Sequence, residues 1–280
     1  MSDKLNIISS VVFIGELQMS QTIGYKRCYA RSLSKCDGKS VEHYISKSIL
    51  ESIGSFKVRG LPWLEPGESK VISANALTAA VLCRHHNSLL SKYDAEAAKL
   101  INHLKLIDGK HTSLELVKVP PSLVIDGSRI EKWFLKTLCA VLASGNYVID
   151  GKGYGALPVS DYLVGLLFNE APWKPGIGLY SAFTDQNRVD AFRGIGFDPV
   201  TSRLGDEATI VGLDVHFWGF PLRGLFATYE NNHPLEKYRP RGLAFMNGKV
   251  RRDVIFSWPT KSVTSNVPIL TRTGTLPENN

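Results

Sequence analysis

Three cysteines and three histidines lie in the first third of this 280-residue sequence, and four of these residues suit a structural zinc ion. The four are Cys28, Cys36, Cys83 and His86, with His85 as an alternative ligand. Three thiolates and one imidazole are a recognised tetrahedral set for zinc. In a chain with reduced thiols, clustered cysteines and histidines indicate a metal more than a disulfide. Alternatively, Cys28 and Cys36 are ordinary buried thiols, since the seven residues between them exceed the usual zinc-knuckle spacing.

Residues with the chemistry of phosphodiester hydrolysis lie among these predicted ligands. A histidine whose pKa is close to neutral pH serves as a general base that activates water. A hard divalent ion held by oxygen ligands relieves charge on the leaving oxygen. The residues of these types are Glu42, His43, Asn75 and Asn87.

These stretches resemble the HNH endonucleases of the ββα-metal type. The resemblance rests on CYARSLSKCDGKSVEHYIS and NALTAAVLCRHHNSLLSKYD, and it covers roughly residues 25–95. It implies that His43 is the general base and that Asn75 orients the catalytic loop. It also implies that Glu42 and Asn87 hold a catalytic Mg²⁺ or Mn²⁺, beside the structural zinc. The implied activity is hydrolysis of DNA, with RNA as the alternative substrate.

The charge of the sequence favours a polyanionic partner. The net charge is +7 and the isoelectric point is about 9.2. Basic residues beside the predicted zinc ligands are predicted to contact a nucleic-acid backbone: Lys26, Arg27, Arg31, Lys35, Arg84 and His85. Contacts of this kind hold phosphates and read little sequence. The alternative is a solvated basic surface.

The same residues also have a non-catalytic interpretation. Glu42 and His43 fit the exposed face of a helix, and Asn75 and Asn87 fit helix N-caps. The cysteines and histidines then form a zinc module that only binds nucleic acid or a partner protein.

A third hypothesis places an enzyme in the later part of the chain. Asp214 and His216 alternate with Trp218 along a predicted strand, so the first two share one face. A buried hydrogen-bonded pair without catalysis is the favoured explanation of these two residues. Cys139 lies on an apolar helix and is predicted to be an inert core residue.

Hydrophobic periodicity predicts the elements that position these residues. They are a strand over 7–14, a helix over 41–53, a loop over 54–70, a helix over 76–105 that is broken at 84–88, and a helix over 129–144. Ser128 and Glu131 fit a capping box for the last helix. After residue 145, alternating apolar segments predict a mostly antiparallel sheet against that helix.

The predicted fold class is α+β, with two domains. Residues 1–107 form a zinc-stapled, HNH-like ββα-metal module, and residues 108–280 form a helix packed on a sheet. The second domain is predicted to recognise a substrate, an effector or a partner, and a homo-oligomer is one such arrangement. The polar tail from about residue 260 is predicted to be poorly ordered.

The sequence gives no sign of a membrane partner. No apolar stretch approaches the roughly 20 residues of a membrane-spanning helix. The N-terminal run lacks the basic region and the cleavage site of a signal peptide. We therefore expect a cytoplasmic protein, and by analogy with similar pairings a restriction or antiviral defence effector.

Overall fold

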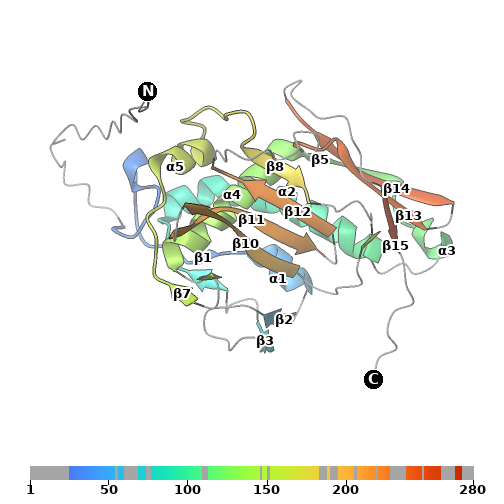
Figure 1. Cartoon of the computed structure of the whole chain (residues 1–280), viewed down its shortest axis with the longest axis horizontal. Helices are drawn as coiled ribbons and strands as arrows, with labels where there is room; N and C mark the ends of the chain where they lie inside the picture. The colour runs from blue at the N-terminus through green and yellow to red at the C-terminus, as the bar shows by residue number, and fades with distance from the viewer. Residues whose placement is uncertain are drawn as a thin grey trace, which may run out of the picture.

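The computed structural model describes fourteen segments of the chain: residues 25–53, 56–59, 69–73, 77–108, 113–145, 147–149, 152–182, 188–189, 195–204, 207–217, 220–227, 238–247, 249–259 and 269–272 (Figure 1). These segments form a mixed fold of helices and largely antiparallel sheets, which confirms the α+β class. The predicted strand over 7–14 and Asn75 lie outside the described residues.

The first part of the chain is built from short strands and one long helix. In chain order its elements are η1 (Arg31–Leu33), β1 (Glu42–His43), α1 (Lys47–Ile53), β2 (Phe56–Arg59), β3 (Ser69–Ile72), β4 (Thr78–Ala79) and α2 (Arg84–Asp108). β1 pairs antiparallel with β4, so that Glu42 lies opposite Ala79. β2 and β3 form a separate antiparallel pair. The chain then enters α2 directly after the β1–β4 pair.

Two predicted helices begin later than the periodicity indicates. The helix over 41–53 is wrong at its start, because Glu42 and His43 lie in β1 and α1 begins only at Lys47. Val41 is 55% exposed, so it does not belong to the buried stripe of Ile45 and Ile49. The helix over 76–105 also begins late, because the sheet partner β4 precedes α2.

The loop predicted over 54–70 is wrong at both ends. Residues 56–59 and 69–72 pair as β2 and β3. The glycines and prolines that suggested a loop lie mostly between these two strands, at 60–67. The alternation of apolar and polar residues in FKVR was a signal for a strand, whereas SKVI does not alternate.

The later part of the chain surrounds one buried helix. Its elements are α3 (Ser113–Leu116), β5 (Ser122–Asp126), α4 (Gly127–Ser144), β6 (Tyr147–Ile149), β7 (Lys152–Tyr154), α5 (Asp161–Phe168), β8 (Gly178–Ser181), β9 (Arg188–Val189), β10 (Ile195–Leu204), β11 (Glu207–Phe217), β12 (Phe220–Leu225), β13 (Gly242–Asn247), β14 (Val250–Ser257) and β15 (Ile269–Arg272). β10, β11, β12 and β8 form a four-stranded antiparallel sheet that lies across α4 (Figure 1).

The second large sheet is mixed, whereas the sequence predicted mostly antiparallel pairing. Its order is β5-β14-β13-β15-β9, and only the β13–β14 pair is antiparallel. β15 lies within the tail that was predicted to be poorly ordered, so that prediction is wrong for residues 269–272.

Helix α4 begins at a different cap from the predicted one. Asp126 is the N-cap, and its carboxylate accepts the backbone N–H of Arg129. The capping box of Ser128 and Glu131 is therefore wrong. Glu131 is instead buried, where its carboxylate accepts the N–H of Leu179 and pairs with Arg239. Gly145 closes the helix in the left-handed conformation with φ 73°.

One buried apolar cluster extends from the first part of the chain into the second. It includes Leu82 and Leu100 together with Trp133 and Phe134 of α4. α4 contacts α2, α5 and strands of both large sheets. The domain boundary at residues 107 and 108 stays a prediction. Because the two parts share one core, α4 packs against α2, the helix that carries His86.

Candidate metal centre

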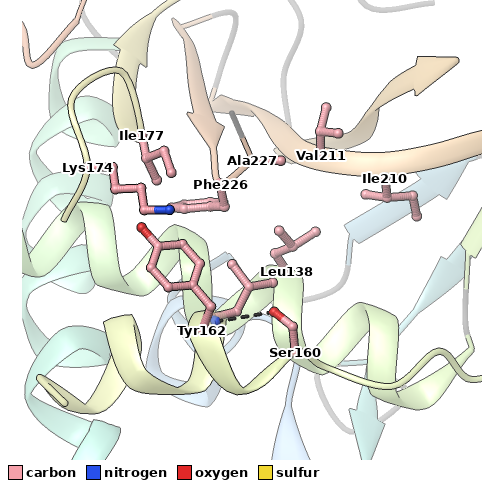
Figure 2. A pocket seen from close by; sticks show the side chains of 10 residues that line it. Leu138, Ser160, Tyr162, Lys174, Ile177, Ile210, Val211, Phe226 and Ala227 are labelled. Carbon is pink, nitrogen blue, oxygen red and sulfur yellow. Dashed lines mark hydrogen bonds between the residues drawn. The ribbon is translucent and has the colours of Figure 1, made fainter. Parts of the chain in front are cut away.

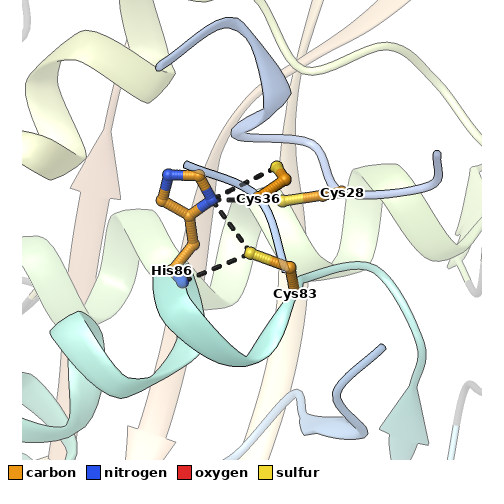
Figure 3. A group of neighbouring side chains, drawn as sticks. All are labelled: Cys28, Cys36, Cys83 and His86. Carbon is orange, nitrogen blue, oxygen red and sulfur yellow. Dashed lines mark hydrogen bonds between the residues drawn. The ribbon is translucent and has the colours of Figure 1, made fainter. Parts of the chain in front are cut away.

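The four predicted zinc ligands come together in space, although 58 residues separate Cys28 from His86 (Figure 3). Their ligand atoms all lie within 4.8 Å of one another. Nδ1 of His86 lies 3.4 Å from Sγ of Cys28, 3.6 Å from Sγ of Cys36 and 3.2 Å from Sγ of Cys83. Ordinary zinc bond lengths in a tetrahedron place nitrogen and sulfur about 3.6 Å apart. The cluster therefore has the donors and the spacing for a structural metal such as zinc.

A tight turn explains how cysteines with seven residues between them reach one metal. η1 folds the chain back between Cys28 and Cys36. Ser34 and Lys35 then adopt positive φ values of 64° and 54°, which turn the chain toward Cys36. Left-handed backbone is unfavourable for residues other than glycine, so this turn needs a compensating interaction. A metal held by Cys28 and Cys36 would supply one.

The start of α2 provides the other two ligands. Cys83 precedes the helix, and His86 lies on its first turn, three residues later. The backbone N–H of His86 points at Sγ of Cys83 at 3.4 Å. Such an N–H stabilises a thiolate, because it donates to the charged sulfur. The ring of His86 packs edge-on against Phe168, with 5.3 Å between centroids, which fixes its orientation.

Backbone hydrogen bonds hold the two halves of the site together. The N–H of Tyr29 donates to the carbonyl of Val81, and the N–H of Ser40 donates to that of Leu82. The N–H of Arg84 donates to the carbonyl of Gly38. These bonds extend the β1–β4 pairing up to the ligands.

The environment of the cluster favours the uncharged forms of its side chains as long as no metal is bound. Burial raises the pKa of the Cys28 thiol, and burial together with the neighbouring thiols raises that of Cys36 to about 12. Burial, reinforced by His85, lowers the pKa of His86, so its imidazole is neutral at pH 7. Neutral imidazole is the form that binds zinc, and a divalent ion stabilises thiolates that are unfavourable without it.

Glu42 and His43 lie side by side on β1 but in different surroundings. Glu42 is 2% exposed, and its Oε1 lies 2.5 Å from Nζ of Lys136. His43 is half-buried, and its Nε2 has no hydrogen-bond partner among the described residues. Burial lowers the pKa of His43, and the nearby charges of Lys47 and Lys136 lower it further.

A buried charge network around Lys136 was missed by the sequence analysis. The Lys136 ammonium also donates to Asp94 of α2, at 2.7 and 2.6 Å from its two carboxylate oxygens. Ser46 donates to Asp94 in turn, and the indole N–H of Trp133 donates to Ser46. Lys136 lies within the mostly apolar sequence of α4, and no feature of the local sequence indicates that it pairs with Glu42 of β1.

Of the two asparagines of the predicted site, Asn87 lies among the described residues. The side-chain amide of Asn87 donates to Oγ of Ser40 at 2.9 Å, which ties α2 to the segment just before β1. Its backbone N–H donates to the carbonyl of Cys83. The role predicted for Asn75 falls outside the described residues.

The predicted nucleic-acid contacts lie close in sequence to the clustered residues, and most of them are exposed. The exposed ones are Lys26, Arg27, Arg31, Lys35 and Arg84. Lys39, which pairs opposite Cys83, is a further exposed cation that the prediction missed. Residues 26–39 hold five basic residues and one acid, Asp37. Asp37 accepts the N–H of His85 at 2.9 Å, and that bond lowers its pKa.

The later candidate pair does not assemble into a site. Asp214 binds Arg223 through two bonds of 2.6 Å, whereas His216 lies 3.7 Å from Asp198. The two residues share a strand, but each has its own partner. Cys139 is fully buried on α4, as an inert core thiol would be, and burial raises its pKa.

Comparison of the chain with protein-family models, curated protein sequences and solved structures gives no match. The resemblance to HNH endonucleases therefore rests on the residues already named. In the described part of the chain, no helix combines the length and hydropathy that a bilayer span needs.

Proposed function

We propose that the zinc module binds nucleic acid through its phosphate backbone. The observation that carries this proposal is the excess of exposed cations on the loop around the metal cluster: five basic residues against one acid over residues 26–39, with Arg84 beside them. The metal fixes this loop to α2. The cations are thus displayed on a rigid support, which lowers the entropy lost when they bind phosphates.

Most of these cations keep their charge available for a partner. Arg84 has an acidic neighbour, Asp37, but their closest atoms are 3.8 Å apart and both side chains are well exposed. An exposed pair of this kind contributes little. Phosphates can therefore displace it, and each contact releases counterions from the nucleic acid. The proposal includes DNA and RNA, because backbone contacts read little sequence.

Neutralising the loop tests this proposal. We expect R27Q/R31Q/K35Q to weaken binding to duplex DNA by about tenfold to a hundredfold and to flatten its salt dependence. Fluorescence anisotropy over a salt series measures both quantities. K118Q/R241Q/K249Q removes three exposed cations elsewhere and is the matched control. Equal affinities of the two triple variants, each with its zinc retained, would refute backbone binding at the loop.

A second candidate function is hydrolysis of the bound strand in the manner of an HNH endonuclease. Two observations favour it. The antiparallel β1–β4 pair leads into α2, as a strand pair leads into the helix of a ββα-metal module, although α1, β2 and β3 lie between β1 and β4 in the chain. His43, the residue that the resemblance assigns as the base, has a lowered pKa and is therefore unprotonated at pH 7, as a general base must be.

The predicted ligands of a catalytic Mg²⁺ or Mn²⁺ do not fit that role in this structure. The Glu42 carboxylate is buried against the Lys136 ammonium at 2.5 Å, so a cation already neutralises it. The Asn87 amide is bonded to Ser40. We therefore assign no catalytic step to a divalent ion, and binding without hydrolysis is the better supported function.

Nicking of supercoiled plasmid distinguishes the two functions. If the chain hydrolyses DNA, H43A should lose about a hundredfold or more in rate while binding DNA as before. The midpoint of the fall in wild-type rate at low pH should lie below the ordinary histidine pKa, because burial lowers the pKa of His43. Lanes with Mg²⁺, Mn²⁺ and EDTA test the need for a metal. Undiminished nicking by H43A would exclude His43 as the base.

A further inference from the structure

A cavity of about 290 Å³ lies between α4, α5, β11 and the end of β12 (Figure 2). Most of its wall is apolar, with Leu138, Ile210, Val211 and Phe226 among the lining residues. Its volume is at the lower end of the range for small-molecule sites. The cavity therefore suits the apolar part of a small ligand.

Two polar groups meet at one end of this cavity. The Tyr162 hydroxyl points toward the Lys174 side chain in Figure 2, and the Lys174 ammonium lies 5.1 Å from the Tyr162 ring centroid. The hydroxyl oxygen is buried and has no hydrogen-bond partner among the described residues. Buried hydroxyls usually have a partner, so this oxygen indicates a missing one.

Lys174 supplies the charge that selects the ligand. Within the described segments, no carboxylate lies within 4.0 Å of its ammonium. One cation and one hydroxyl match a single carboxylate, which accepts from both. A phosphate dianion would need more donors than this end of the cavity offers.

We propose that the cavity binds a small hydrophobic monocarboxylate. Its carboxylate accepts from Lys174 and Tyr162, and its apolar part lies against Leu138 and Phe226. Such a ligand contacts α4, α5 and the strand ends at once, and binding stabilises the folded state. This inference is independent of nucleic-acid binding, because it involves no residue of the zinc module.

Calorimetric titration of the full zinc-loaded chain with octanoate tests the inference. We expect saturable binding of one octanoate, weakened about tenfold by K174Q and about threefold by Y162F. A227L places a larger side chain at the cavity wall and should abolish binding. K118Q, an exposed lysine away from the cavity, should bind like the wild type.

Matched probes make the outcome decisive. Octan-1-ol and octylammonium share the chain length of octanoate but lack the carboxylate, and both should bind at least tenfold more weakly. Thermal unfolding of each variant confirms that it is folded. Absence of saturable octanoate binding by the wild type would overturn the inference. Equal binding of octan-1-ol, or an unchanged affinity in a folded K174Q, would overturn it as well.

Discussion

Replacing Cys83 with alanine is expected to abolish zinc binding and to unfold the loop that carries Cys28 and Cys36. Cys83 is fully buried, and its Sγ lies 3.2 Å from Nδ1 of His86, so its loss removes one of the four clustered donors. The free energy of structural zinc binding is largely folding free energy, about 10–16 kcal/mol in small zinc peptides. Loss of even about 5 kcal/mol would lower the Tm by roughly 10–20 °C.

Zinc content and thermal unfolding of C83A measure this effect. C139A is the matched control, because Cys139 is equally buried but lies on α4, outside the cluster. It should keep one zinc per chain and lose only about 1–3 kcal/mol of stability through its cavity. A chelator should reproduce the C83A result in the wild type. Full zinc occupancy in C83A would contradict the assignment of ligands.

The second large effect is expected at Lys136. K136M should lower the free energy of unfolding by about 3–5 kcal/mol, because it leaves the buried carboxylates of Glu42 and Asp94 without their cation. Burial alone would lower the pKa of Lys136, but its two carboxylate partners outweigh burial and raise it. The wild-type lysine therefore stays charged across the ordinary pH range.

The loss in K136M should depend on pH. Burial raises the pKa of Glu42, and the attraction of Lys136 offsets part of that rise. Without Lys136 the pKa rises further, so the folded variant takes up a proton more readily as the pH falls. The destabilisation should thus be smaller at about pH 5 than at about pH 8.

Urea unfolding at both pH values measures the loss, and Lys132 on the same helix provides the matched control. K132M removes a buried lysine whose direct partner is the neutral side chain of Asn169. Burial lowers the pKa of Lys132 to about 8, so its charge is already unfavourable there. We expect K132M to cost less than about 1 kcal/mol. Equal losses in both variants would show that the ion pairs of Lys136 have no special role.

The cluster of Cys28, Cys36, Cys83 and His86 was predictable because metal chemistry restricts the choice of residues. Cysteine and histidine are scarce in this sequence, and the spacing of Cys83 and His86 places both at the start of α2. The wide spacing of Cys28 and Cys36 was harder to interpret. Its explanation, η1 followed by two left-handed residues, depends on local geometry that residue types alone do not specify.

The surroundings of Glu42 could not be predicted, because they depend on long-range packing. Apolar residues from 41 to 53 fit a helix, yet pairing with β4 outweighs that propensity at Glu42 and His43. The partner of Glu42 comes from α4, 94 residues later in the chain. From the sequence alone, a lysine such as Lys136 is expected at the surface. Its burial depends on two carboxylates, Glu42 and Asp94, that lie far from it in the chain.

X-ray absorption at the zinc edge tests the central claim most directly, namely that three cysteines and one histidine hold a structural zinc. For the purified wild type we predict three sulfur ligands at about 2.3 Å and one nitrogen at about 2.0 Å, with no oxygen ligand. Zinc-free folded protein, or a shell containing oxygen in place of sulfur, would contradict the assignment and the rigid basic loop that depends on it.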